Sequence, residues 1–163
     1  MKKKIAFLTA VLLVVLLFCL TGCNTDFKFS KLELTAENVT SISVSYGDAG
    51  SKFTATSSKI EKIIGELNNL EIEKYKEEVN DNIFTDSVIG IVTIEQEGKS
   101  GSFVMTFAQT TLVDNTKVAL LKCEAKDGFK IKNMPKDIYQ MSSVDDTNAL
   151  LSKLFANYIW IFR

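Results

Sequence analysis

The sequence contains no histidine. Histidine is the side chain that most often acts as a general base near neutral pH, and it is the commonest metal ligand. A Ser-His or Cys-His catalytic pair is therefore excluded within this chain. Because no other grouping of side chains is typical of a catalytic centre, we assign no catalytic residue and no cofactor, and we expect the protein not to be an enzyme.

Cysteine is scarce, and the three cysteines differ in their surroundings. Cys19 lies in an apolar run near the start, Cys23 follows the end of that run, and Cys123 stands alone in the second half. A disulfide within the domain is not expected, because Cys19 and Cys23 belong to the N-terminal segment described below and Cys123 is left without a partner. A reactive thiol needs exposure and nearby positive charge. The strand pattern turns Cys123 inward instead, so we predict a small core residue.

Basic side chains are too few to leave a positive excess. The chain has 19 basic and 20 acidic residues, and its first 22 residues contribute three lysines and no acid. The remainder therefore carries 16 basic and 20 acidic residues, a net charge of −4. Nucleic-acid binding requires a basic surface, and electrostatic attachment to anionic lipid requires a polybasic patch. Neither mode of binding is expected here.

The chain does have one long apolar run near its start. Residues 1–4 include three lysines, and residues 5–20 follow with Thr9 as their single polar side chain. As a helix this run would span about 24 Å, which is short for a transmembrane segment. A basic start, a short apolar run and small residues at its end are typical of a signal peptide.

The run ends in the tetrapeptide Leu20-Thr21-Gly22-Cys23. This tetrapeptide resembles the lipobox of bacterial lipoproteins, in which a large aliphatic residue and two small residues precede a cysteine. The resemblance implies that a diacylglyceryl group is added to the Cys23 thiol and that cleavage occurs before Cys23. Two acyl chains, of the palmitate kind, suffice for stable anchoring. An uncleaved signal anchor is the alternative, and both place residues 24–163 outside the cytoplasm, on the outer face of the cell membrane.

We therefore expect three parts: a signal peptide at 1–22, a lipidated cysteine and tether at 23–38, and a single domain at 39–163. The domain is long enough to bury one hydrophobic core without disulfides. Phe27 and Phe29 alternate with polar neighbours, so part of the tether is a candidate edge strand. The opening of the domain also resembles, loosely, that of many small lipoproteins of low-GC Gram-positive bacteria, and this resemblance transfers no site.

Alternation of apolar and polar side chains predicts strands through most of the domain. In the first half we expect a hairpin of residues 39–46 with 52–56. A helix at 58–69 and a short strand within 70–75 follow it. The clearest hairpin follows, at 88–96 with 99–108. A two-residue Glu97-Gly98 turn would set Val92 opposite Phe103, with the apolar side chains of both strands on one face.

The second half is expected to hold another hairpin, which joins 118–125 to 129–132 through a three-residue loop. A short helix or turn at 135–141 and a helix at 143–162 complete the chain. Ser143 is a candidate cap for this last helix, since two aspartates fall in its first turn. The predicted fold class is α+β: an antiparallel sheet of about six strands, with one helix after the first hairpin and a C-terminal helix covering one sheet face.

Few residues outside the lipobox are candidates for a site. Asp81 and Asp86 crowd one polar loop with Asn82, where oxygen ligands for calcium are conceivable. Their spacing does not match an EF-hand, and a solvated loop explains them more simply, so we assign no metal site. Tyr158 and Trp160 are candidates for a contact patch near the C-terminus.

Residues 71–78 are rich in glutamate interleaved with lysine, at positions Glu71, Glu73, Lys74, Lys76, Glu77 and Glu78. A charged strand of this kind is typical of a sheet edge that discourages pairing with other chains. We therefore interpret this segment as a solvated edge.

Three functions are compatible with these observations. The first is a non-catalytic binding module at the cell surface, held by its lipid and contacting a surface protein. The second is an immunity or inhibitor lipoprotein directed against a secreted toxin or enzyme, because its acidic charge suits a basic target. The third is an enzyme that uses carboxylates or a bound metal.

Overall fold

The computed structural model describes residues 27–46, 52–55 and 57–159, with side chains in most of these ranges. The elements in chain order are η1 (Phe29–Leu32), β1 (Val39–Tyr46), β2 (Lys52–Thr54), α2 (Ser57–Asn68), β3 (Ile72–Lys74), α3 (Ile83–Asp86), β4 (Val88–Gln96), β5 (Ser102–Thr111), β6 (Lys117–Lys126), β7 (Ile138–Met141) and α4 (Val144–Ile159).

The strands form one sheet of seven, in the order β2-β1-β4-β5-β6-β7-β3, and every pairing is antiparallel. The predicted α+β class is therefore confirmed. β3 and β2 are the two edges, so the glutamate-rich segment does lie at a sheet edge, as its charges predicted.

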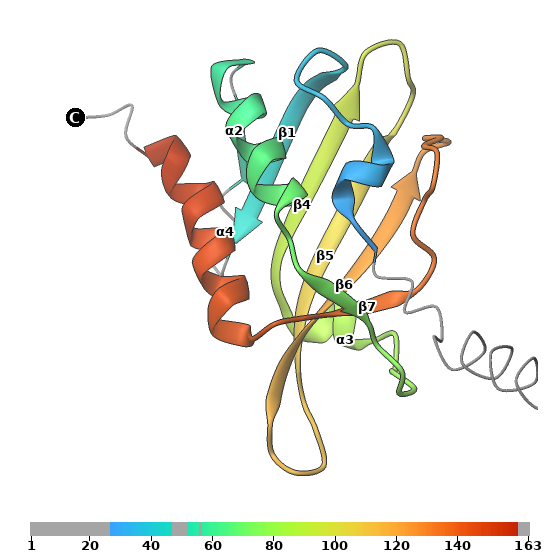
Figure 1. Ribbon diagram of the computed structural model, residues 1–163, viewed down its shortest axis with the longest axis vertical. Coiled ribbons are helices and arrows are strands. Elements are labelled where there is room, and N and C mark those ends of the chain that lie inside the picture. Colours follow the sequence, from blue (N-terminus) through green and yellow to red (C-terminus); the bar gives the residue numbers. More distant parts are fainter. Residues whose placement is uncertain (1–26, 47–51, 56, 160–163) are drawn as a thin grey trace, which may run out of the picture.

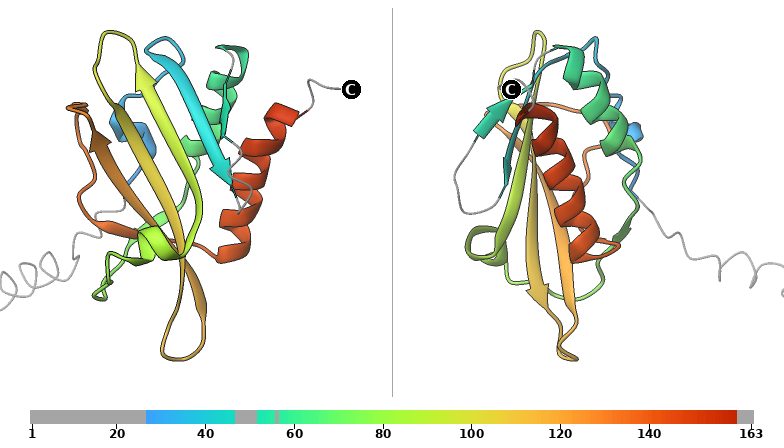
Figure 2. Two further views of the ribbon diagram at one scale, coloured as in Figure 1. Left: turned by 180° about the vertical axis from the view of Figure 1, so that it is seen from behind. Right: turned by 90° about the vertical axis from the view of Figure 1, so that its left-hand side faces the viewer.

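The two long helices and η1 lie on the same face of the sheet (Figures 1 and 2). The short α3 lies on the other face (Figure 2). Each long helix presents an apolar stripe with helical spacing to the sheet, and the buried members are Ile60, Ile63, Ile64 and Leu67 of α2 and Leu151 and Leu154 of α4. Within the described ranges, no helix combines the length and apolar character needed to span a bilayer.

The core lies between this helical layer and the inward side of the central strands. Buried residues alternate with less buried ones in β4 and β7, as expected for a sheet with one covered face. In β5 and β6, residues 105–108 and 118–121 are buried without interruption. Fully buried strand residues of this core include Ile42, Val44, Val92, Ile94, Phe103, Met105, Phe107 and Leu121. The outward positions of β1, by contrast, are serines, and Ser41 donates a hydrogen bond to Glu95 across the strands at 2.6 Å.

The described part of the expected tether belongs to the domain. Phe27, Phe29, Leu32 and Leu34 are all buried in the core. The segment forms the 3-10 turn η1 where an edge strand had been considered, and the Phe29 ring lies 6.3 Å from the ring of Phe103. A tether is therefore confined to residues before 27, which lie outside the described residues.

The predicted hairpin of 88–96 with 99–108 exists, but its register differs from the prediction. Val92 lies opposite Met105, where the two-residue turn had set it opposite Phe103. The loop between β4 and β5 is five residues long, from 97 to 101. Because the register differs by two residues, the same side chains still face the core.

The expected strand at 129–132 is absent, and β6 pairs with β7, where a short helix or turn had been predicted. After β6 the chain turns through Asp127 and Gly128, both with positive φ. Phe129 is then buried, with Lys99 Nζ 5.3 Å from its ring centroid. Phe129 therefore packs against the β4–β5 loop, and Ile131 packs against the core.

Ser143 caps α4, as predicted. Its Oγ accepts a hydrogen bond from the Asp146 backbone N–H at 2.9 Å and donates one to Asp146 Oδ2 at 2.6 Å. Replacing Ser143 by Ala is expected to lower the free energy of unfolding by about 1 kcal/mol, because these bonds satisfy a free end of the helix. Chemical denaturation of both proteins measures the change. Ser142→Ala is the matched control, and an equal loss there would show that the cap is not the cause.

Candidate functional site

The predicted C-terminal contact patch lies largely outside the described residues. Trp160 and the side chain of Tyr158 lie outside the described residues, as does Cys23. The backbone of residue 158 belongs to α4. The C-terminal patch and the lipidation site therefore stay predictions.

Asp81 and Asp86 are each engaged by their own chain. Asp81 Oδ1 accepts a hydrogen bond from Lys122 Nζ at 3.2 Å, and Asp86 Oδ1 accepts one from Thr85 Oγ1 at 3.0 Å. In the described part of the chain, no three acidic or cysteine side chains are grouped as metal ligands would be. Asp81 therefore links the segment before β4 to β6, whereas the hydrogen bond of Asp86 stays within α3.

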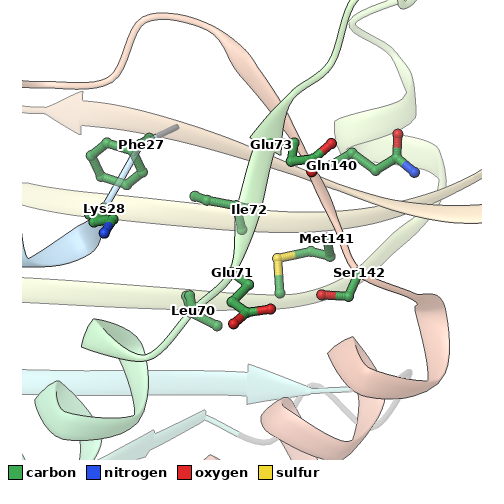
Figure 3. A pocket seen from close by; sticks show the side chains of 9 residues that line it. All are labelled: Phe27, Lys28, Leu70, Glu71, Ile72, Glu73, Gln140, Met141 and Ser142. Atoms are coloured by element: carbon green, nitrogen blue, oxygen red, sulfur yellow. The ribbon is translucent and has the colours of Figure 1, made fainter. Parts of the chain in front are cut away.

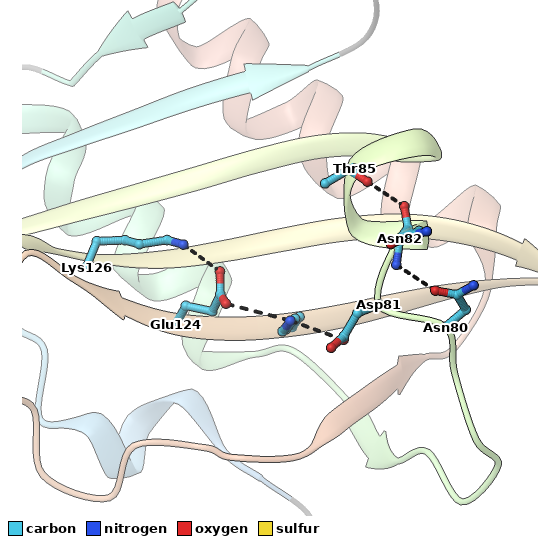
Figure 4. A network of polar contacts seen from close by, with 7 residues as sticks. Asn80, Asp81, Asn82, Thr85, Glu124 and Lys126 are labelled. Carbon is cyan, nitrogen blue, oxygen red and sulfur yellow. Dashed lines mark hydrogen bonds and ion pairs between the residues drawn. The ribbon is translucent and has the colours of Figure 1, made fainter.

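The ion pair of Asp81 with Lys122 belongs to a row of charged side chains along the outer face of β6 (Figure 4). Lys126 Nζ lies 3.0 Å from Glu124 Oε2, and Lys122 Nζ lies 3.6 Å from Glu124 Oε1. The hydrogen bond from Lys126 holds the pKa of the Glu124 carboxyl below its usual range. These charges are alternating and paired, as on an ordinary solvated sheet face.

Cys123 is buried, as predicted, opposite Met105 of β5. Burial away from water raises the pKa of its thiol to about 12, and the nearby Glu124 carboxylate adds to this effect. A thiolate is the reactive form of cysteine. This environment therefore disfavours a nucleophile.

The strongest candidate site is a cleft of about 500 Å³ beside β3, the edge strand. Its apolar part is made by Phe27, Leu70, Ile72 and Met141 (Figure 3). Phe27 and Ile72 are themselves almost fully buried, and the Phe27 ring lies 5.3 Å from the ring of Tyr139. The floor of the cleft is thus part of the packed core. Two further hollows, of about 210 and 550 Å³, flank α3.

The rim of this cleft is polar and acidic. It carries Glu71, Glu73, Gln140, Ser142 and Lys28. Glu71 and Glu73 are exposed, and within the described part of the chain neither side chain forms an ion pair or a hydrogen bond.

A neighbouring lysine does not neutralise these two carboxylates. Lys74 is bound to Asp137, with Nζ 2.7 Å from Oδ1. Because Lys74 alternates in direction with Glu73 along the strand, the two side chains lie on opposite faces of β3.

The backbone of β3 is paired on one side. Tyr75 N–H donates to the carbonyl of Ile138 at 2.9 Å, which makes these two residues a hydrogen-bonded pair of the β3–β7 ladder. Such pairs alternate along an antiparallel ladder, so the N–H and C=O groups of Ile72 and Lys74 point away from β7. Phe27 and Lys28 lie on that same side of β3 (Figure 3). The cleft therefore borders unpaired backbone donors and acceptors.

Sequence reasoning found the acidic rim but missed the cleft. Its apolar floor combines Phe27, which had been assigned to a tether, with Met141, which had been assigned to a helix or turn. The burial of Tyr139 and Met141 between less buried neighbours is the two-residue period of a strand. The apolar Ile138 at an outward position hides that period in the sequence.

Comparison of the chain with known protein families, with curated proteins and with solved structures found no match.

Proposed function

We propose that this protein is a bacterial lipoprotein, held on the outer face of the cell membrane by lipid on Cys23, whose domain is a non-catalytic binding module. One observation carries the anchor: a basic start, an apolar run of 16 residues and then Leu20-Thr21-Gly22-Cys23. Two acyl chains on this cysteine hold the protein stably at a bilayer.

The cleft beside β3 supports the binding role. It has the size of a ligand site, an apolar floor and a few polar groups at its rim, which is the usual make-up of a recognition site. Phe27 lies four residues after Cys23. Four residues span at most about 14 Å, so the anchor holds this cleft at the membrane-proximal side of the domain.

The anchor is tested by expressing the full chain in a bacterial host supplied with a radiolabelled fatty acid. We expect the protein to carry the label and to sediment with membranes. Cys23→Ala is expected to lose the label and to keep its signal peptide, because the thiol that receives the lipid is absent. Gel mobility, label and membrane fractionation measure these outcomes.

Cys19→Ala is the matched control, since it removes a cysteine from the apolar run and leaves the lipobox whole. This variant is expected to be labelled and processed like the wild type. Label retained by Cys23→Ala would contradict the proposed anchor, as would an unlabelled wild-type protein.

A second candidate is an immunity or inhibitor lipoprotein, favoured by the net charge of −4 on the expected mature chain. Such a charge steers association with a basic target. Deletion of the gene would then make cells sensitive to a secreted product of neighbouring cells. Unchanged survival in mixed culture would leave the general binding role in place.

A further inference from the structure

We propose that the open edge of β3 binds an extended basic segment of a partner protein as an added strand. The inference rests on the proposed binding function and names the class of partner. Strand addition is a recurring mode of peptide recognition, in which main-chain hydrogen bonds give affinity and alternate side chains give specificity.

The backbone groups of β3 supply the first requirement. Ile72 and Lys74 direct their N–H and C=O groups away from β7, and β3 is the last strand of the sheet. An added strand lies about 4.8 Å from its neighbour, on the side where the cleft lies. Phe27 and Lys28 line that cleft as well (Figure 3).

The charges on β3 define the chemistry of the partner. Glu71 and Glu73 project from the same face of the strand, two residues apart, and have no cation from the described part of the chain. The cross-strand neighbour of Glu73 on β7 is the neutral Gln140. Basic side chains at alternate positions of an added strand would lie directly beside these carboxylates, where opposite charges attract.

The other face of the added strand would meet apolar surface. Ile72 alternates with the two glutamates and is buried, and Phe27 and Leu70 line the same cleft. Small apolar residues between the basic residues therefore suit this face. The segment that fits best alternates basic and apolar side chains, which separates it from the acidic surface of this protein itself.

The test uses the full-length protein purified from membranes in detergent and a fluorescent peptide, acetyl-Lys-Val-Lys-Val-Lys-amide. Fluorescence anisotropy is expected to show saturable binding, and acetyl-Glu-Val-Glu-Val-Glu-amide is expected to bind at least about tenfold more weakly. Glu71→Gln with Glu73→Gln should lower the affinity for the lysine peptide and flatten its dependence on salt.

A proline variant separates strand addition from simple attraction of charge. Lys74→Pro removes an N–H that points away from β7, so the β3–β7 ladder keeps its bonds, and proline is tolerated at edge strands. We expect this variant to bind the lysine peptide about tenfold more weakly. Lys74→Ala is the matched control: it also loses the ion pair with Asp137 but keeps the N–H, and it should bind like the wild type.

Three results would overturn the inference: equal binding by the proline and alanine variants, equal binding of the two peptides, or slow hydrogen exchange of the Ile72 and Lys74 amides before peptide is added. The last result would show that the edge is already occupied, for example by residues 23–26. Mass spectrometry of the same sample reports the lipid on Cys23. If the protein is lipidated but does not bind the peptide, strand addition is refuted and the lipid anchor is supported. If the protein binds the peptide but is not lipidated, the anchor is refuted and strand addition is supported.

Discussion

Replacing Phe103 by Ala is expected to lower the free energy of unfolding by about 3–5 kcal/mol. The side chain of Phe103 is fully buried near the start of β5, between Ile94 of β4 and Ala125 of β6. Its ring also lies 6.3 Å from that of Phe29 in η1. The truncation removes apolar burial, leaves a cavity, and loosens the contact that fastens the N-terminal segment to the sheet.

Thermal and chemical denaturation measure this loss. Domains of this size are stabilised by about 5–15 kcal/mol, so a melting temperature lower by roughly 10 °C is expected. Val104→Ala is the control, because Val104 is the next residue of the same strand but points to the opposite, partly exposed face. If Val104→Ala destabilised the protein as much as Phe103→Ala, the inward face of β5 would be assigned wrongly.

The face of each central strand was predictable because it depends on a two-residue period in the sequence. The register of β4 against β5 was not predictable, because it depends on the conformation of the loop between them. Gly101 has a positive φ and packs so closely on β6 that a Cβ at this position would collide with the carbonyl oxygen of Lys126. A glycine that is required by contact with β6, the strand after β5, gives no local signal. The dipeptide Glu97-Gly98 looked like a complete turn on its own.

The strand that pairs with β6 was predicted wrongly for a related reason. Residues 129–132 carry apolar side chains directly after a turn, which is the local pattern of a hairpin. The structure uses those side chains differently: Phe129 packs under Lys99, which also donates hydrogen bonds to Gln96 and to the carbonyl of Lys130. A local pattern could not reveal this long-range competition, and β7 was consequently missed.

In the candidate site, too, one part was predictable from the sequence and another part was not. The acidic edge was predictable from the charges of 71–78 alone, because an exposed edge strand needs them. The apolar floor was not, since Phe27 and Met141 come from distant segments that meet only when β7 joins the sheet. The buried aromatic residues at 27 and 29 were nevertheless a signal that the domain begins before residue 39.

The thiol of Cys123 is expected to react roughly 1,000-fold more slowly in the folded protein than in the unfolded chain. A pKa of about 12, against the ordinary value of 9.0, leaves about 1,000-fold fewer thiolates at pH 8, and burial limits access further. Alkylation by iodoacetamide, followed on the Cys123 peptide by mass spectrometry with and without guanidinium, measures both rates. A double variant, Cys123→Ala with Ala125→Cys, moves the thiol two residues along β6 to an exposed position. This variant should react fast in the folded protein.

The same shift makes the stability depend on pH. The folded protein keeps the Cys123 proton up to about pH 12, whereas the unfolded chain releases it near 9.0. The unfolded state therefore binds fewer protons between these values, and the free energy of unfolding falls as pH rises through them. The contribution is fully present below pH 9.0 and is lost toward pH 12. Cys123→Ala should flatten this decline relative to the wild type, and parallel curves for the two proteins would show that the thiol is not held protonated by the core.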